Sequence, residues 1–198
     1  MSSTAVVLAD LFAGYRSWYR EHWMPKLLAD LGEEEADLVE FGWHDPIAGL
    51  RPATGDEIAA LADRFGPLPA SYLDFLRTVG TGGLLLPTGR WQDYALEPTE
   101  LIFTRPADVP EAHVAFRSWL HEEWYEANAG IDLSRMMPIM GVDVNFVLLS
   151  LQHPGDDRVN VWRHDAEPFR LDSDTRLVDL LDQVIESGKR EQGLPFRL

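Results

Sequence analysis

Apolar side chains near the start of the chain recur every three or four residues, which is the spacing of one helix face. They are Leu8, Leu11, Phe12, Tyr15, Trp18 and Tyr19. Pro25 predicts that this helix stops or kinks near His22 or Trp23, because proline lacks the amide hydrogen that a helix interior needs. Residues 32–53 contain glycines, prolines and few periodic apolar residues, which predicts an irregular connection.

Two short helices are predicted next. The first follows Thr54-Gly-Asp-Glu57, a capping box in which threonine and glutamate oxygens each accept a hydrogen bond from a backbone N–H. A glycine and a proline at 66–67 end it. The second helix begins after Pro69. Its apolar face consists of Tyr72, Phe75, Leu76 and Val79.

Beyond these helices the apolar pattern becomes that of strands, interrupted by one predicted helix over 110–127. The predicted strands are 84–86, 101–103, 136–140, 145–151 and 158–162, with 169–171 as a further candidate. A polar turn over 152–157 suits a hairpin, and a final helix runs from about 177 to Gly188. This order predicts an α+β fold with helices packed on a mainly antiparallel sheet.

Charge and composition narrow the classes of function. The chain of 198 residues has no cysteine, which excludes a disulfide scaffold, a thiolate zinc site and a cysteine nucleophile. Its 33 acidic and 17 basic residues give a net charge of -16, which disfavours nucleic acid and membranes and favours a basic protein partner. The N-terminus lacks a basic leader and no apolar run approaches the roughly 20 residues of a membrane span, so the expected location is cytoplasmic.

Residues that could carry catalysis or hold a metal form no specific pattern. The sequence contains no glycine-rich phosphate loop, no nucleophile elbow and no pair of histidines at the spacing of a helical zinc site. His153 lies in a turn with Asp156 and Asp157, where a cation would bind only weakly. We therefore expect no metal, no cofactor and no enzymatic activity. A hydrolase whose acid and histidine residues meet only in the fold is the alternative from another class.

Acidic charge is densest over residues 31–66, which contain nine acids and two arginines, a net charge of −7. Such a run is either a solvated face or a docking patch for a basic partner. Trp18, Trp119 and Trp124 lie on helical stripes and are predicted to be core. Tryptophans in loop-like sequence either cover the core or anchor a partner. The hypothetical partner surface comprises Glu33, Glu34, Glu35, Asp37, Trp43, Trp91, Asp156 and Asp157.

Several short motifs follow one another over residues 54–187. They are Leu61-Ala-Asp-Arg-Phe-Gly-Pro-Leu-Pro69, Ser71-Tyr-Leu-Asp-Phe-Leu-Arg-Thr-Val-Gly80, Gly82-Gly83, Pro138-Ile-Met-Gly141, Asn145-Phe-Val-Leu-Leu-Ser-Leu151 and Val159-Asn-Val-Trp-Arg-His-Asp165. In this order they resemble the SUKH superfamily, which includes the fungal cell-wall assembly regulators of the Smi/Knr type. One departure is Gly80-Thr-Gly-Gly83, where members often carry Asn before the Gly-Gly pair.

The resemblance implies an α+β fold and a non-enzymatic role. Bacterial members are mostly immunity proteins that bind and block a cognate toxin, often a nuclease, and fungal members are signalling scaffolds. We expect one domain over 1–198, in which 1–53 form a helical extension with an acidic connection and 54–187 form the SUKH-like core. The expected function is a cytoplasmic immunity protein that binds a basic toxin domain. An intracellular regulatory scaffold of the cell-wall assembly regulator type is the alternative.

Overall fold

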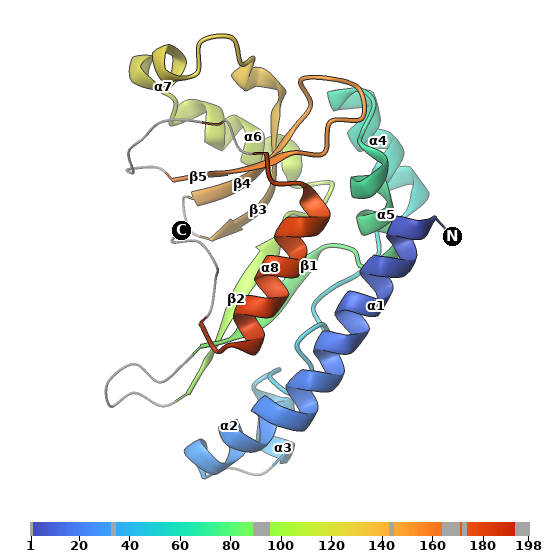
Figure 1. Cartoon of the computed structure of the whole chain (residues 1–198), viewed down its shortest axis with the longest axis vertical. Coiled ribbons are helices and arrows are strands. Elements are labelled where there is room, and N and C mark those ends of the chain that lie inside the picture. Colours follow the sequence, from blue (N-terminus) through green and yellow to red (C-terminus); the bar gives the residue numbers. More distant parts are fainter. Residues whose placement is uncertain are drawn as a thin grey trace.

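The computed structural model describes residues 2–32, 35–88, 96–142, 145–163, 171 and 174–192. These residues contain a five-stranded sheet in which each strand pairs antiparallel with the strand before it in the chain. The strands are β1 (Gly82–Pro87), β2 (Pro98–Phe103), β3 (Met136–Val142), β4 (Asn145–Ser150) and β5 (Val159–Trp162). The predicted α+β class, the antiparallel sheet and the β4–β5 hairpin are confirmed (Figure 1).

The N-terminal helix is longer than predicted. It consists of α1 (Ser3–Trp18), a π-helical turn η1 (Tyr19–Trp23) and α2 (Met24–Leu31). In the wider turn the Met24 amide donates to the Tyr19 carbonyl, which places Pro25 in the first turn of α2, where no amide hydrogen is needed. The chain is therefore perturbed close to the predicted position but continues as a helix, and it runs away from the N-terminus along the molecule (Figure 1).

Three shorter helices follow, α3 (Glu35–Glu40), α4 (Gly55–Phe65) and α5 (Ala70–Thr78). The α3 helix lies in the stretch predicted to be irregular, where Leu38 is fully buried and supplies its contact with the core. The capping box of α4 is confirmed, since the Glu57 amide donates to the Thr54 hydroxyl at 3.2 Å and the Thr54 amide donates to the Glu57 carboxylate at 2.7 Å. The predicted inner face of α5 is buried.

The helix predicted over 110–127 is wrong as a single element. The chain forms α6 (Val109–Ser118) and α7 (Glu122–Ala127), and Trp119 at the break is 41% exposed instead of core. The break allows α7 to direct Trp124 onto Trp162 of β5, with ring centroids 5.7 Å apart. A short 3₁₀ turn, η2 (Leu133–Arg135), and the closing helix α8 (Leu177–Lys189) complete the described elements.

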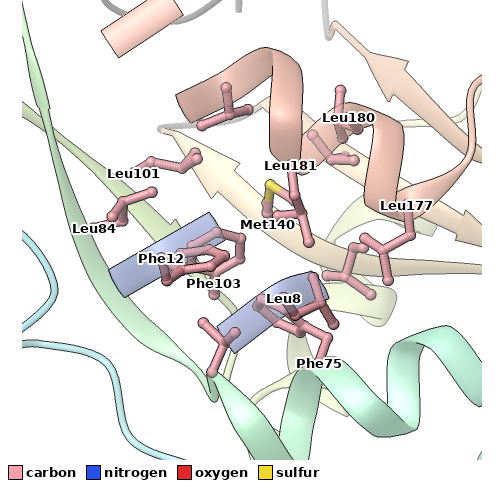
Figure 2. Packing of buried hydrophobic residues seen from close by; sticks show 14 of the residues in the cluster. Leu8, Phe12, Phe75, Leu84, Leu101, Phe103, Met140, Leu177, Leu180 and Leu181 are labelled. Atoms are coloured by element: carbon pink, nitrogen blue, oxygen red, sulfur yellow. The ribbon is translucent and has the colours of Figure 1, made fainter. Parts of the chain in front are cut away.

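Apolar side chains gather on both faces of the sheet, because alternate residues of a strand point to opposite sides. In β4, Val147 and Leu149 join the main cluster, whereas Leu148 joins the second, which includes Phe116 of α6 and Trp124. Trp18 is only partly buried against the main cluster. Figure 2 shows the main cluster, with α1, α5, α8 and the sheet contributing Leu8, Phe12, Phe75, Leu84, Leu101, Phe103, Met140, Leu177, Leu180 and Leu181.

The closing helix packs close to the sheet. All its predicted inward residues are buried, and Gly188, expected to stop the helix, instead lies within its last turn. A β carbon at Gly188 would lie 3.2 Å from Leu86 of β1 and 3.4 Å from the Tyr15 hydroxyl of α1. The glycine therefore permits the close approach of α8 to β1 and α1. Because α1 lies in this core, residues from the N-terminal extension and from the SUKH-like part pack together.

Candidate functional site

The Gly80-Thr-Gly-Gly83 sequence allows the loop before α4 to lie directly against β1. Gly80 and Gly82 have φ angles of 93° and 125°, which side chains other than glycine rarely adopt. A β carbon at Gly80 would lie 2.0 Å from the Arg51 carbonyl carbon, and one at Gly82 would lie 2.1 Å from the Gly49 oxygen. Backbone hydrogen bonds of 3.0 and 2.9 Å join Arg51 and Thr81. The glycines of this motif therefore hold two backbone segments together.

This loop forms one wall of an open groove of about 910 Å³ over β1 and β2. Ile102 of β2 is exposed within it, and the segment between β2 and α6 forms the opposite wall. The charged residues of the groove are balanced, with Arg51, Glu100, Arg105 and Asp108. Arg105 contacts Asp108 at 2.6 Å. The groove therefore has the shape of a binding site but no electrostatic preference for a basic partner.

Asp156 and Asp157, here called the turn acids, lie between β4 and β5 and have partners within the protein. Asp156, whose side chain is 7% exposed, accepts hydrogen bonds from Arg158 at 2.9 and 2.8 Å and from the Ser150 hydroxyl at 2.7 Å. The hydrogen bond from the Arg158 guanidinium, assisted by Ser150, lowers the pKa of Asp156 to about 2.

The neighbouring Asp157 is also engaged. It accepts hydrogen bonds from the Ser71 hydroxyl at 3.1 Å and from Arg176 at 3.0 Å. The turn acids thus connect the hairpin to α5 and to the start of α8. Within the part of the chain that the structure describes, no group of three or more His, Asp and Glu side chains is arranged to hold a metal ion.

The other predicted acids lie at or near α3. Glu35 begins this helix and Asp37 lies within it, while Glu33, Glu34 and Trp91 lie outside the described residues. In Figure 1, α3 is drawn next to α2, at the end of the long helical segment that lies opposite the N-terminus. The turn acids are close to that terminus, since Asp157 bonds Ser71 of α5 and Ser2 bonds Asp74 of the same helix. The structure therefore does not bring the two predicted acidic groups together.

Trp43, in contrast, does lie beside the α3 acids. It is half-buried, its carbonyl accepts a hydrogen bond from the Tyr19 hydroxyl at 3.0 Å, and its ring centroid is 5.3 Å from that of Phe41. Phe41 and Val39 are 49% and 55% exposed. We call Asp37, Val39, Glu40, Phe41 and Trp43 the α3 patch.

The two exposed apolar residues of the α3 patch, Val39 and Phe41, were not identified from the sequence. Val39 and Phe41 flank Glu40 in an acidic stretch that has no helical stripe, so the periodicity of the sequence gives no reason to bury them. Apolar residues that stay exposed while their neighbour Leu38 is buried are the signal that points to a contact surface. Their exposure beside carboxylates makes the α3 patch a candidate contact surface.

Comparison with known families gives one result. A profile of the SMI1 / KNR4 family (SUKH-1) matches residues 52–176. No curated protein and no solved structure shows significant similarity to the chain. Among the described residues, no helix has the length and apolar character needed to cross a membrane. The match covers more than half of the chain and includes the paired glycines, the sheet and the hairpin, so the chain belongs to the SMI1 / KNR4 (SUKH-1) family.

Proposed function

We propose that this SUKH-family chain is a non-enzymatic immunity protein that binds a cognate basic toxin domain through the α3 patch. The observation that carries the proposal is the exposure of Val39 and Phe41 beside the carboxylates of Asp37 and Glu40. Burial of exposed apolar side chains against a partner makes the free energy of binding more favourable. An aromatic residue is a frequent centre of a binding site. The adjacent carboxylates select a partner of positive charge.

The overall charge supports the same kind of partner. With a net charge of -16, the chain attracts a basic domain over a distance and raises its rate of association. A nuclease toxin presents positive charge where it binds phosphates, so an acidic protein competes for that surface. Binding there would prevent access of nucleic acid without any chemistry by the immunity protein.

Two described carboxyl groups with lowered pKa values owe the shift to hydrogen bonds within the protein. A hydrogen bond from Ser134 lowers the pKa of Asp132, and the bond from Arg158 lowers that of Asp156. Both shifts keep the groups charged at neutral pH. A carboxylic acid that donates a proton in catalysis needs a raised pKa, so these two residues are better explained by structural hydrogen bonds.

The test first identifies the partner and then measures whether the chain neutralises its toxicity. The tagged chain is used to capture its partner from the native host, and the captured protein is expressed alone and together with the chain. We expect the partner to be toxic alone and harmless when co-expressed. Phe41→Ala should weaken binding about tenfold or more and reduce protection, because it removes the exposed ring of the α3 patch.

Tyr125→Ala is the matched control, since Tyr125 is an aromatic residue on α7 that is 51% exposed and lies outside the α3 patch. It should bind and protect as the natural sequence does. If Phe41→Ala protects as well as the control, the α3 patch is not the docking surface. A captured partner without toxicity would favour the regulatory scaffold over the immunity protein.

A further inference from the structure

Three arginines line one open pocket between α4, α6 and η2, with a volume of about 660 Å³. They are Arg64 at the end of α4, Arg117 in the last turn of α6 and Arg135 in η2. No acidic residue is among the described residues that line this pocket. In a chain with 33 acids and 17 basic residues, such a concentration of positive charge is unexpected from composition.

The walls of the pocket are held by specific contacts. Arg135 donates its Nε hydrogen to the Leu151 carbonyl at 2.6 Å, and the His113 Nε2 donates to the Ser134 carbonyl at 3.1 Å. The His113 ring packs edge-on against Phe65, with centroids 5.3 Å apart. These contacts join the end of α4 to α6 and α6 to η2. The arginines are therefore attached to elements that hold one another in place.

The guanidinium groups of this pocket differ from several others that are paired within the protein. Arg158 and Arg176 pair with the turn acids, and Arg16 pairs with Asp45. In the described part of the chain, Arg64 and Arg117 make no ion pair. Two arginine side chains are thus available to a ligand, with a third whose Nε alone is occupied by a carbonyl.

Nearby titratable groups respond to this positive charge. Burial lowers the pKa of His113, and the charges of Arg117 and Arg64 lower it further. The Ser134 hydroxyl lowers the pKa of Asp132, and the charges of Arg135 and Arg117 lower it further. Asp132 already accepts hydrogen bonds from the Ser134 amide and hydroxyl, at 3.0 and 2.5 Å. The charge of three arginines is therefore only partly balanced.

We propose that this pocket binds the phosphate group of a small phosphate ester. One guanidinium can satisfy a planar carboxylate through two parallel hydrogen bonds. A tetrahedral phosphate has more acceptor oxygens and a charge approaching two, so it suits guanidiniums that converge from three elements. Phe65, Val114 and Leu151 line the same pocket and offer apolar contact to the organic part of the ester. This site is separate from the α3 patch and does not depend on toxin binding.

The test uses the full chain and NMR signals of the His113 ring. Phenyl phosphate, inorganic phosphate, acetate and sodium chloride are titrated at matched ionic strength. We expect saturable shifts with both phosphates, tighter binding of phenyl phosphate, and a rise in the pKa of His113 when the site is occupied, because an anion stabilises the imidazolium. Acetate should bind more weakly, and a phosphoserine peptide more weakly than phenyl phosphate.

Variants separate the site from general charge effects. Arg64→Ala and Arg117→Ala should each weaken phosphate binding about tenfold, since each removes charge-assisted hydrogen bonds. Arg117→Lys should recover only part of the loss, because it restores the charge without the planar group. Arg77→Ala, at an exposed arginine of α5 outside the pocket, is the matched control and should bind normally.

Three results would overturn the proposal. Equal shifts with chloride and phosphate would show screening without a site. Equal affinity of Arg117→Ala and Arg77→Ala for phosphate would remove the pocket from the interaction. Acetate, inorganic phosphate or the phosphopeptide binding as tightly as phenyl phosphate would exclude specificity for a small phosphate ester.

Discussion

The β4–β5 turn and the α3 patch both contain closely spaced acidic residues, but their carboxylates have different surroundings. Asp156 is paired with Arg158, and Asp157 is paired with Arg176. In the α3 patch, Asp37 and Glu40 lie beside the exposed side chain of Phe41. The turn acids therefore form ion pairs that hold elements of the fold together. The α3 patch instead presents carboxylates next to exposed apolar side chains.

The sequence around each group explains this difference. Arg158 follows the turn acids directly, and its backbone amide and guanidinium both donate to Asp156. No lysine or arginine occurs between Lys26 and Arg51, so α3 has no basic neighbour in its own segment. Asp156 therefore has a basic partner close along the chain, whereas the acids of α3 have no lysine or arginine within residues 27–50.

The largest expected loss of stability comes from a substitution in the core. It gives a reference for the smaller losses expected in the β4–β5 turn and the α3 patch. Phe75 of α5 packs against Phe103 of β2, with ring centroids 5.0 Å apart, and is almost fully buried. Phe75→Ala should lower the free energy of unfolding by about 3–5 kcal/mol, because it leaves a cavity as well as losing apolar contact. Urea unfolding measures this loss, and Tyr125→Ala should change stability by less than about 0.5 kcal/mol. A loss below about 1 kcal/mol for Phe75→Ala would contradict the central place of α5 in the core.

A smaller effect is expected at the turn acids. Asp156→Asn keeps the size of the side chain but removes the charge that Arg158 and Ser150 recognise. We expect a loss of about 1–3 kcal/mol, typical of a mostly buried, charged hydrogen-bonding group. Glu40→Gln in the α3 patch is the matched change and should cost less than about 0.5 kcal/mol. Equal effects of the two substitutions on the urea midpoint would remove the distinction between the regions.

The pH dependence of stability tests the same contrast. Arg158 holds the pKa of Asp156 at about 2 in the folded protein, below the ordinary value of 3.8. The charged form therefore stabilises the folded state above about pH 4, and this contribution is lost as the pH falls toward 2. The stability difference between the natural sequence and Asp156→Asn should be constant near neutral pH and shrink between pH 4 and 2. A difference that stays the same over this range would contradict the role of the ionised carboxylate.

Much of the fold could be predicted because its signals are local. The capping box at Thr54 and the apolar stripes of α5 and α8 lie within single elements, and each is present in the structure. The break between α6 and α7 is different, because it depends on the contact of Trp124 with Trp162, which are 38 residues apart. The apolar stripe over 110–127 is compatible with one helix until that long-range contact is known.

The sites were less predictable for the same reason. Asp157 is held by Ser71 and Arg176, which lie 86 and 19 residues away. Arg64, Arg117 and Arg135 likewise come from three separate elements and meet only in the fold. Clusters of acids and isolated arginines can be read from the sequence, but which charges are neutralised depends on tertiary contacts.

The smallest expected effect on stability comes from the acidic run beside α3, and its effect on kinetics should be the clearest. The sequence predicts that this charged run is solvated, so replacing Glu33, Glu34 and Glu35 together by Lys should change the free energy of unfolding by no more than about 0.5 kcal/mol per site. Association with the proposed basic partner should slow at low salt, because like charges then face one another. The effect should fade as salt rises, since the Debye length falls from about 10 Å at 0.1 M to about 3 Å at 1 M. Stopped-flow measurement of the association rate at both salt concentrations tests this. Unchanged rates at low salt, in a correctly folded variant, would make the run a solvated face and leave binding at the α3 patch to its apolar residues.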